Sequence, residues 1–128
     1  MVGVMVCGSR SITDVSWVEN QIVNYLKEIY TDDLDFIIIN GKARGVDSIA
    51  REWAINHNVG NWDFPAEWDK YGRSAGFKRN AEMVDKCDYC LILWDGQSHG
   101  TKHDIDLCIQ KGKPYKVVMY NNPRKIID

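Results

Sequence analysis

The feature that most constrains the fold is a regular alternation of two apolar patterns along the chain. Short apolar runs with the length and composition of buried strands cover residues 2–7, 35–40, 59–64, 87–94 and 115–120. Between these runs, apolar residues recur three and four positions apart, as on one face of a helix. Strands that are separated by helices pair in parallel, and the helices then cover both faces of the sheet.

Four helices are predicted from these stripes, and Thr13 or Asp14 is placed to cap the first. The apolar positions are Val15, Val18, Ile22, Leu26 and Ile29, then Val46, Ile49, Ala50, Trp53 and Ala54, then Phe77, Ala81 and Val84, and last Ile105, Cys108 and Ile109. Residues 65–72 are predicted to form a loop. We therefore expect an α/β fold, a Rossmann-like three-layer sandwich with a five-stranded parallel sheet in the order 3-2-1-4-5, built by residues 1–128 as one domain.

The charge of the chain argues against some partners. It has 16 basic and 18 acidic residues, a net charge of −2 and a pI of about 5.9. Duplex nucleic acid, which binds through many basic contacts, is not expected, and single-stranded DNA is disfavoured for the same reason. The apolar start, residues 1–7, is too short for a signal peptide, and no stretch is long enough to span a membrane. We expect a cytoplasmic protein with no membrane partner and no cofactor.

Function is expected where strands one, two and four run into helices, because ligands bind at the carboxyl edge of such sheets. The switch point should lie between strands one and four. These three turns are rich in glycine, arginine and hydroxyl groups, which suits an anionic ligand, although short turns of this kind often need glycine anyway. The candidate ligand-binding residues are Gly8, Ser9 and Arg10, then Gly41, Arg44, Gly45 and Asp47, then Gly96, Ser98, Gly100 and Thr101.

A further wall of the site is predicted from the segment that follows strand three. Trp68 and Tyr71 precede the cations Arg73, Lys78 and Arg79. Aromatic rings beside cations suit a nucleobase with a phosphate. The alternative is that the rings only cover the edge of the sheet.

Two interpretations of Ser98 compete. Residues 96–100 match G-x-S-x-G, the nucleophile elbow of serine hydrolases. That reaction needs an acid and a histidine downstream, whereas the only histidine beyond the turn is His103, too close to act as a triad base. We therefore expect Ser98 to donate a hydrogen bond to phosphate, together with the N–H groups at a helix start.

No metal site is expected. His99 and His103 lie four residues apart, but no third ligand is apparent. Cys87 and Cys90 spell C-x-x-C within a predicted strand, where their side chains would point to opposite faces. All four cysteines are predicted to be reduced structural thiols.

The motifs "GSRSITD", "NGKARGVDSIA", "FPAEWDKYGRSAGFKRNAEM" and "LILWDGQSHGTKHDI" resemble the YspA-like branch of the SLOG superfamily over residues 2–119. The resemblance implies a Rossmann-like fold that binds nucleotides or nucleotide-derived molecules. The superfamily includes lonely-guy-type, cytokinin-activating phosphoribohydrolases, DNA-processing proteins and sensor domains of phage defence.

The resemblance also implies roles for two residues as catalytic candidates. The enzyme signature R-K-x-x-M corresponds to residues 79–83, which keep Arg79 but have Asn80 in place of lysine; Asn80 is a further candidate ligand residue. The signature P-G-G-x-G-T-x-x-E corresponds to residues 96–104 and ends on Asp104 rather than glutamate. The shorter side chain moves the carboxylate by about 1.5 Å. The resemblance therefore implies ligand binding by this chain more strongly than it implies catalysis.

Two functional classes remain open. In the first, the domain senses or sequesters a nucleotide or ribose-phosphate ligand without turning it over. In the second, it is a phosphoribohydrolase that releases a base with Arg79 and Asp104. The expected partner is a small nucleotide-like ligand, and a homodimer is expected because related domains pair and because the chain has five Trp and six Tyr.

Overall fold

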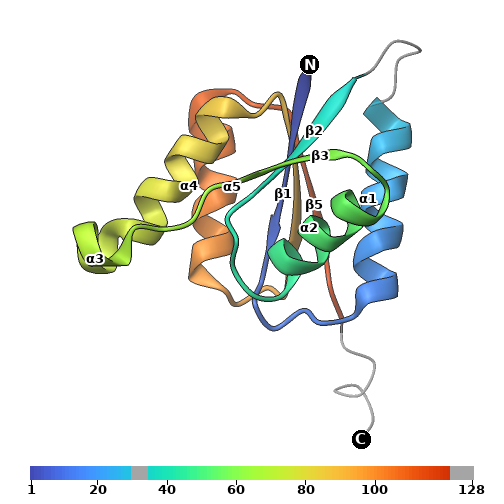
Figure 1. Cartoon of the computed structure of the whole chain (residues 1–128). Coiled ribbons are helices and arrows are strands. Elements are labelled where there is room, and N and C mark those ends of the chain that lie inside the picture. The colour runs from blue at the N-terminus through green and yellow to red at the C-terminus, as the bar shows by residue number, and fades with distance from the viewer. Residues whose placement is uncertain (30–34, 122–128) are drawn as a thin grey trace, which may run out of the picture.

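The computed structural model describes residues 1–29 and 35–121. Five parallel strands form one sheet in the order β3-β2-β1-β4-β5, which confirms the predicted order (Figure 1). The strands are β1 (Val2–Gly8), β2 (Phe36–Asn40), β3 (Gly60–Asp63), β4 (Tyr89–Trp94) and β5 (Tyr115–Met119). The helices are α1 (Val15–Ile29), α2 (Val46–Asn56), α3 (Trp68–Tyr71), α4 (Ala75–Lys86) and α5 (His99–Lys111).

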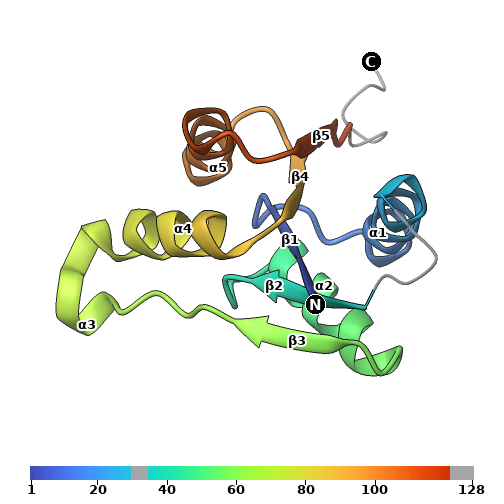
Figure 2. The ribbon, with the colours of Figure 1, turned by 90° about the horizontal axis from the view of Figure 1, so that it is seen from above.

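The helices α1 and α2 cover one face of the sheet, and α4 and α5 cover the other, as Figure 2 shows when the molecule is viewed from above. Side chains alternate along β1, so Val4 and Val6 pack with α1 and α2, whereas Met5 and Cys7 pack with α4 and α5. Both faces of the strand are therefore fully apolar. This explains why the central strands are continuous apolar runs rather than alternating ones.

The register of the sheet places two turns side by side. Gly8, the last residue of β1, pairs with Leu93 of β4. Both strands therefore end at the same level, and the segments that follow them leave the sheet together at its carboxyl edge, the lower end of the sheet in Figure 1. This is the predicted switch point.

The helix starts depend on capping. Of the two predicted caps for α1, it is Asp14 whose carboxylate accepts a hydrogen bond from the N–H of Trp17, at 3.2 Å.

No helix in residues 1–29 and 35–121 is both long and apolar enough to cross a membrane.

Two predictions for residues 65–84 were wrong. The segment predicted as a loop, residues 65–72, contains the one-turn helix α3, followed by a 3₁₀ turn over Gly72–Ser74. Phe77, assigned to the buried stripe of α4, is 51% exposed; the buried stripe instead includes Ala75, Met83 and Val84. The helix has too few apolar residues for their spacing to separate its buried face from its exposed face.

The cysteines lie in the core, but not in the way that the strand pattern suggested. Cys87 caps the end of α4 instead of starting β4, and it packs in the same apolar cluster as Cys90. All four cysteines are buried and free. The assignment to opposite faces was therefore wrong because the strand begins two residues later than predicted.

Candidate functional site

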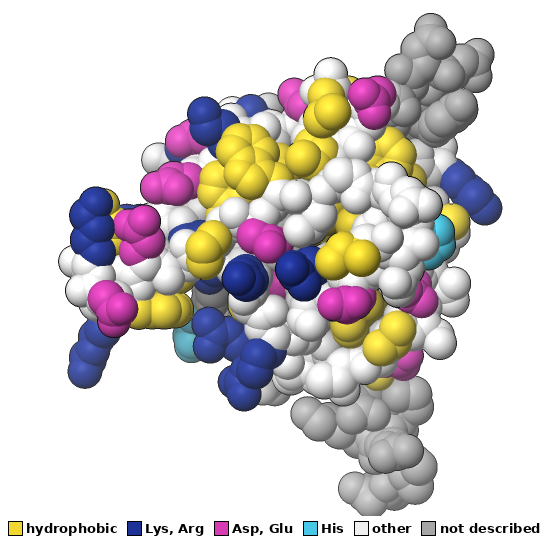
Figure 3. Space-filling view, in the orientation of Figure 1, with side chains coloured by type: hydrophobic (Ala, Val, Ile, Leu, Met, Phe, Trp, Pro, Cys, Tyr) yellow, Lys and Arg dark blue, Asp and Glu magenta, His cyan; other side chains and the backbone are white. Residues whose placement is uncertain are grey.

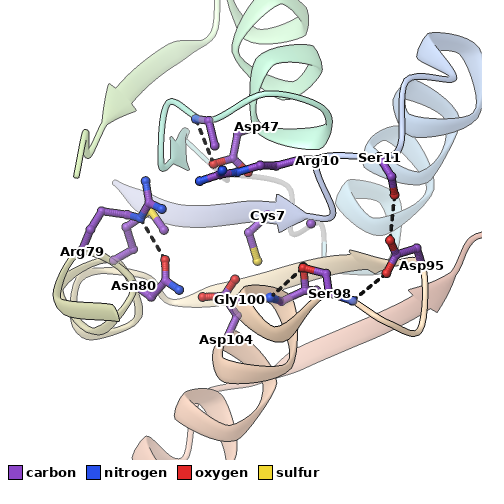
Figure 4. Close-up of a pocket in the computed structure, with 14 residues that line it drawn as sticks. Cys7, Arg10, Ser11, Asp47, Arg79, Asn80, Asp95, Ser98, Gly100 and Asp104 are labelled. Carbon is purple, nitrogen blue, oxygen red and sulfur yellow. Dashed lines mark hydrogen bonds between the residues drawn. The ribbon is translucent and has the colours of Figure 1, made fainter. Parts of the chain in front are cut away.

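A cavity of about 380 Å³ opens at the carboxyl edge of the sheet, between the ends of β1 and β4 (Figure 4). This volume lies within the range of small-molecule sites. Six segments contribute to it: β1 and its turn, the turn after β2, the start of α2, α4, the turn after β4, and α5. The lining residues are Cys7, Gly8, Arg10, Ser11, Ala43, Asp47, Arg79, Asn80, Met83, Asp95, Ser98, Gly100, Thr101 and Asp104.

Ser9 ties the first and third turns together from beneath the cavity. Its N–H donates to the carbonyl of Leu93 at 3.0 Å, and its Oγ accepts the N–H of Asp95 at 3.0 Å. The same hydroxyl lies 3.5 Å from Oγ1 of Thr101, at the start of α5. Ser9 is fully buried, so its hydrogen bonds fix the turns.

Asp95 organises the turn after β4. Its carboxylate accepts the N–H groups of Gln97 and Ser98, both at 2.9 Å, and the hydroxyl of Ser11 at 2.7 Å. Partial burial alone would raise the pKa of Asp95, but these bonds and the hydroxyl of Ser9 lower it to about 2. Backbone donors that the sequence suggested for phosphate are therefore already occupied by a carboxylate of the chain.

Ser98 is the N-cap of α5. Its Oγ accepts the N–H of Thr101 at 3.4 Å and the Thr101 hydroxyl at 3.1 Å. No histidine contacts this hydroxyl in residues 1–29 and 35–121, so nothing there activates it as a nucleophile. The helix start it caps leaves the N–H of Gly100 at the cavity wall.

The turn after β2 is shaped by Asp47. This carboxylate accepts the N–H of Gly41 at 3.0 Å and, more weakly, that of Ala43 at 3.4 Å. Burial, the largest influence, raises the pKa of Asp47 to about 6, although the guanidinium groups of Arg79 and Arg10 and the two N–H groups favour the charged form. Asp47 therefore holds the turn in place and also contributes a titratable carboxylate to the cavity.

Arg79 reaches across from α4 to the same turn. Its Nη1 donates to the carbonyl of Gly41 at 2.5 Å, and its Nε donates to Oδ1 of Asn80 at 2.9 Å. A Cβ on Gly41 would lie 2.7 Å from Nη1 and 2.9 Å from Asp47 Oδ2. The glycine thus allows the close approach of the guanidinium, which the sequence could not reveal.

Asp104 supplies the most unusual group of the cavity. It is 5% exposed, and its Oδ1 is the one buried side-chain oxygen or nitrogen in the described residues that has no hydrogen-bond partner. Burial, followed by the negative charge of Asp47, raises the pKa of Asp104 to about 7, while a hydrogen bond with Cys7 and the charge of Arg79 act in the opposite direction. An unsatisfied buried acceptor costs free energy until a donor reaches it.

The structure brings many of the predicted residues to this cavity, namely Gly8, Arg10, Asp47, Arg79, Asn80, Ser98, Gly100, Thr101 and Asp104. Ser9, Gly41 and Gly45 lie behind its lining. A Cβ on Gly45, whose φ is +72°, would lie 2.6 Å from the carbonyl oxygen of Ser9. These residues shape the turns that carry the site.

Other predicted residues do not line the cavity. They are Arg44, Trp68, Arg73 and Gly96. Trp68 is 51% exposed on α3, with its ring against Gly76. Figure 2 shows α3 at the end of a long excursion away from the sheet. The helical turn therefore carries the aromatic segment away from the strand ends.

Five lining residues were missed by the sequence reasoning: Cys7, Ser11, Ala43, Met83 and Asp95. Ser11 and Asp95 stand in turns that had been singled out, so their polarity was available as a clue. Cys7 and Met83 belong to the apolar core, and no pattern separates a core side chain from one at the base of a cavity.

The sequence of the chain is similar to those of a known protein family. The family model described as "YspA, cpYpsA-related SLOG family" matches residues 2–71. The Gene 61 protein of Mycobacterium phage D29 is 34% identical over 117 residues, which cover 87% of this chain and 91% of the phage protein. The chain belongs to the YspA, cpYpsA-related SLOG family. Within this SLOG chain, all four motifs that carried the resemblance contribute residues to the lining of the cavity.

Solved structures share the fold of this SLOG chain at low sequence identity. DNA processing protein A of Streptococcus pneumoniae aligns with a TM-score of 0.73 and 15% identity, over 96% of this chain and 52% of that one. The Helicobacter pylori protein of the same name aligns with a TM-score of 0.66 and 19% identity, over 95% and 67%. The SLOG chain thus spans about half the length of the streptococcal protein.

This likeness corrects the prediction about partners. The H. pylori structure is described for its single-stranded DNA binding mode. The expectation that the partner is only a small nucleotide-like ligand, with nucleic acid disfavoured, is therefore wrong. The acidic pI was a poor guide because it sums charge over the whole chain, whereas contacts to a strand depend on local cations. Figure 3 shows basic and acidic side chains interspersed on one face of the molecule.

Proposed function

We propose that the cavity binds a nucleotide unit through its ribose phosphate, either as a free nucleotide or as part of a nucleic-acid strand. In this proposal the protein is a sensing or sequestering module that holds the nucleotide unit without changing it chemically. It rests on the distribution of donors and acceptors around the cavity, since specificity comes from a few polar groups with fixed positions.

The observation that carries the proposal is the unpartnered Oδ1 of Asp104. A buried carboxylate oxygen at the base of a cavity needs a hydrogen-bond donor, and ribose hydroxyl groups are such donors. A bare phosphate would instead be repelled by Asp104 and Asp47. The ligand therefore presents hydroxyl groups to this side of the cavity and keeps its anionic group elsewhere.

The anionic group has suitable partners among the donors that line the cavity. Arg10, which is exposed, and Arg79 both line it, and Gly100 stands in the first turn of α5, where the helix dipole favours negative charge. Figure 4 shows Asp104 pointing into the space between the Arg10 and Asp47 side and the start of α5. A ribose phosphate fits this polarity in one orientation, with its hydroxyls toward Asp104.

A second function, hydrolysis of the bond between base and ribose, is favoured by the raised pKa of Asp104, about 7. A group that titrates near neutral pH exchanges protons efficiently in catalysis. In this reaction Asp104 would take a proton from water as the oxygen bonds to C1′ of the ribose, and the bond from C1′ to the base nitrogen would break. The base would leave with a proton from solvent, and Arg79 would hold the ribose phosphate.

Calorimetric titration with AMP, ribose 5-phosphate and a 5′-phosphorylated oligonucleotide tests the proposal. Arg79→Ala is expected to weaken binding about ten- to hundredfold, the effect of losing a charge-assisted hydrogen bond. Arg51→Ala is the matched control, since its guanidinium pairs with Asp63 at 3.1 Å and does not line the cavity. If none of the three probes binds at millimolar concentration, the proposal fails.

The same samples separate the two functions and the two sources of the ligand. Chromatography after incubation with AMP detects free adenine if the base is released, and Asp104→Asn should abolish that release while leaving binding. Intact AMP supports the binding module. Tighter binding of the oligonucleotide than of AMP would assign the site to a strand, and the reverse would assign it to a free nucleotide.

A further inference from the structure

His103 stands directly behind the cavity wall, between α4 and α5. Its Nδ1 lies 3.5 Å from Nδ2 of Asn80, and its ring packs edge-on against Phe77 with ring centres 4.5 Å apart. Asn80 is 6% exposed and lines the cavity, whereas His103 does not. The histidine therefore reaches the site only through the amide of Asn80.

The amide of Asn80 connects His103 to Arg79. Its Oδ1 accepts the Nε of Arg79 at 2.9 Å, and the guanidinium continues to the carbonyl of Gly41. The three polar side chains thus form one line, from the α4–α5 interface to the cation at the cavity wall. Figure 4 shows Arg79 and Asn80 side by side at one end of the cavity, joined by this bond.

Hydrogen-bond chemistry fixes the direction of every bond in this line. Arg79 only donates, so Asn80 must turn its oxygen toward Nε and its NH₂ group toward His103. The histidine must then accept at Nδ1, which requires a neutral ring that carries its proton on Nε2. A protonated ring donates at both nitrogens and would face the NH₂ group of Asn80 donor to donor.

We propose that His103 is a positioning residue that holds Arg79 in its ligand-binding place through Asn80, and that protonation of His103 releases this hold. On protonation the amide of Asn80 turns to offer its oxygen to the ring, and its NH₂ group then faces the Nε–H of Arg79. The guanidinium loses its hydrogen bond to Asn80, keeps the one to the carbonyl of Gly41, and becomes mobile. The expected effect on ligand affinity rests on the proposed function. The hydrogen bonds that link His103, Asn80 and Arg79 do not depend on it.

The surroundings of His103 favour the neutral ring at neutral pH. Burial lowers its pKa, and the carboxylate of Asp106 one turn further along α5 acts in the opposite direction. Asp106 is itself paired with Lys102 at 2.8 Å. From α4, Phe77 and Asn80 contact the ring, and neither side chain titrates. The hold on Arg79 is thus engaged at neutral pH and is lost on acidification.

Two other groups of the cavity titrate in a nearby range, with the opposite effect on an anion. Asp47 and Asp104 have pKa values of about 6 and about 7. Their protonation removes negative charge, which favours an anionic ligand. A pH profile of the wild type alone would mix these effects, so the test compares it with a variant that lacks only the titration of His103.

The test follows the Nε–H resonance of Arg79 by nitrogen-15 NMR as the pH is lowered, without ligand. In the wild type we expect a change whose midpoint equals that of the ring protons of His103. In His103→Asn, whose Oδ1 takes the place of Nδ1 and does not titrate, that component should be absent. In His103→Leu, which neither accepts nor titrates, that component should be absent as well.

Dispersed amide spectra identify the variants that are folded, so each comparison remains valid. An identical pH response of Arg79 in the wild type and in His103→Asn would overturn the proposal. For ligand affinity, His103→Leu should weaken AMP binding at pH 8 about two- to tenfold, the worth of one neutral hydrogen bond, and His103→Asn should restore it. If AMP does not bind at all, the proposed function fails, while the resonance of Arg79 still decides the role of His103.

Discussion

Asp104→Asn is expected to stabilise the protein, although it alters a residue of the candidate site. The carboxylate is almost fully buried and has one oxygen without a partner. At high pH the wild type must hold a negative charge there, close to that of Asp47. The amide has the same shape and no charge, so the variant avoids this desolvation cost.

The size and the pH range of the effect follow from the pKa of Asp104, which is about 7 in the folded chain and 3.8 without burial. Between these values the folded state binds more protons than the unfolded state, so the free energy of unfolding falls as the pH rises. A difference of about 3 pH units corresponds to about 4 kcal/mol. We expect the variant to match the wild type near pH 4 and to exceed it by roughly 2–4 kcal/mol at pH 8.

Urea denaturation at several pH values measures this difference directly. Asp106→Asn is the matched control, because Asp106 lies on the same helix with 55% of its side chain exposed and is paired with Lys102. Its effect should stay within about 1 kcal/mol at every pH. A variant Asp104→Asn that is less stable than the wild type at pH 8, or a difference between them that does not grow with pH, would contradict a raised pKa of Asp104.

Further predictions concern glycines and the cap of α5. Gly41→Ala places a Cβ 2.7 Å from Nη1 of Arg79, so AMP binding in calorimetry should weaken about tenfold or more; unchanged affinity would contradict the placement of the guanidinium. Gly45→Ala, at a φ of +72° and against the backbone of residues 9 and 10, should lower the free energy of unfolding by about 2 kcal/mol or more, whereas Gly100→Ala, with open space around the new Cβ, should raise it by about 0.5–1 kcal/mol. Ser98→Ala should cost about 1 kcal/mol of stability through the lost cap and should not prevent binding; loss of all binding would show that the hydroxyl contacts the ligand.

The strand order could be predicted from the sequence because the glycine- and hydroxyl-rich turns after strands one and four placed the switch point between these two strands. Continuous apolar runs such as β1 and β4 signal central strands that are buried on both faces. The position of α3 could not be predicted, because a single turn of helix has too few residues to show a period. The exposure of Phe77 was missed for a related reason, since an aromatic residue near a helix start fits either face.

The candidate site could be predicted to the level of its segments. Glycine-rich turns after parallel strands meet at one edge, so residues such as Arg10 and Ser98 were expected together. Which groups remain free for a ligand depends on partners distant in sequence. Asp95 occupies N–H groups that seemed available, and Arg79 approaches Gly41 from α4. Neither relation leaves a pattern in the sequence.

Binding of a nucleotide unit by its ribose phosphate is proposed for the cavity between β1 and β4. The most direct test is a nitrogen-15 NMR titration of the labelled chain with AMP and, separately, with a 5′-phosphorylated oligonucleotide. We expect saturable shifts of the backbone amides of residues 8–11 and 98–104 with at least one of the two probes, and no shifts in β3. Shifts confined to other surfaces, or none at millimolar concentration, would contradict it.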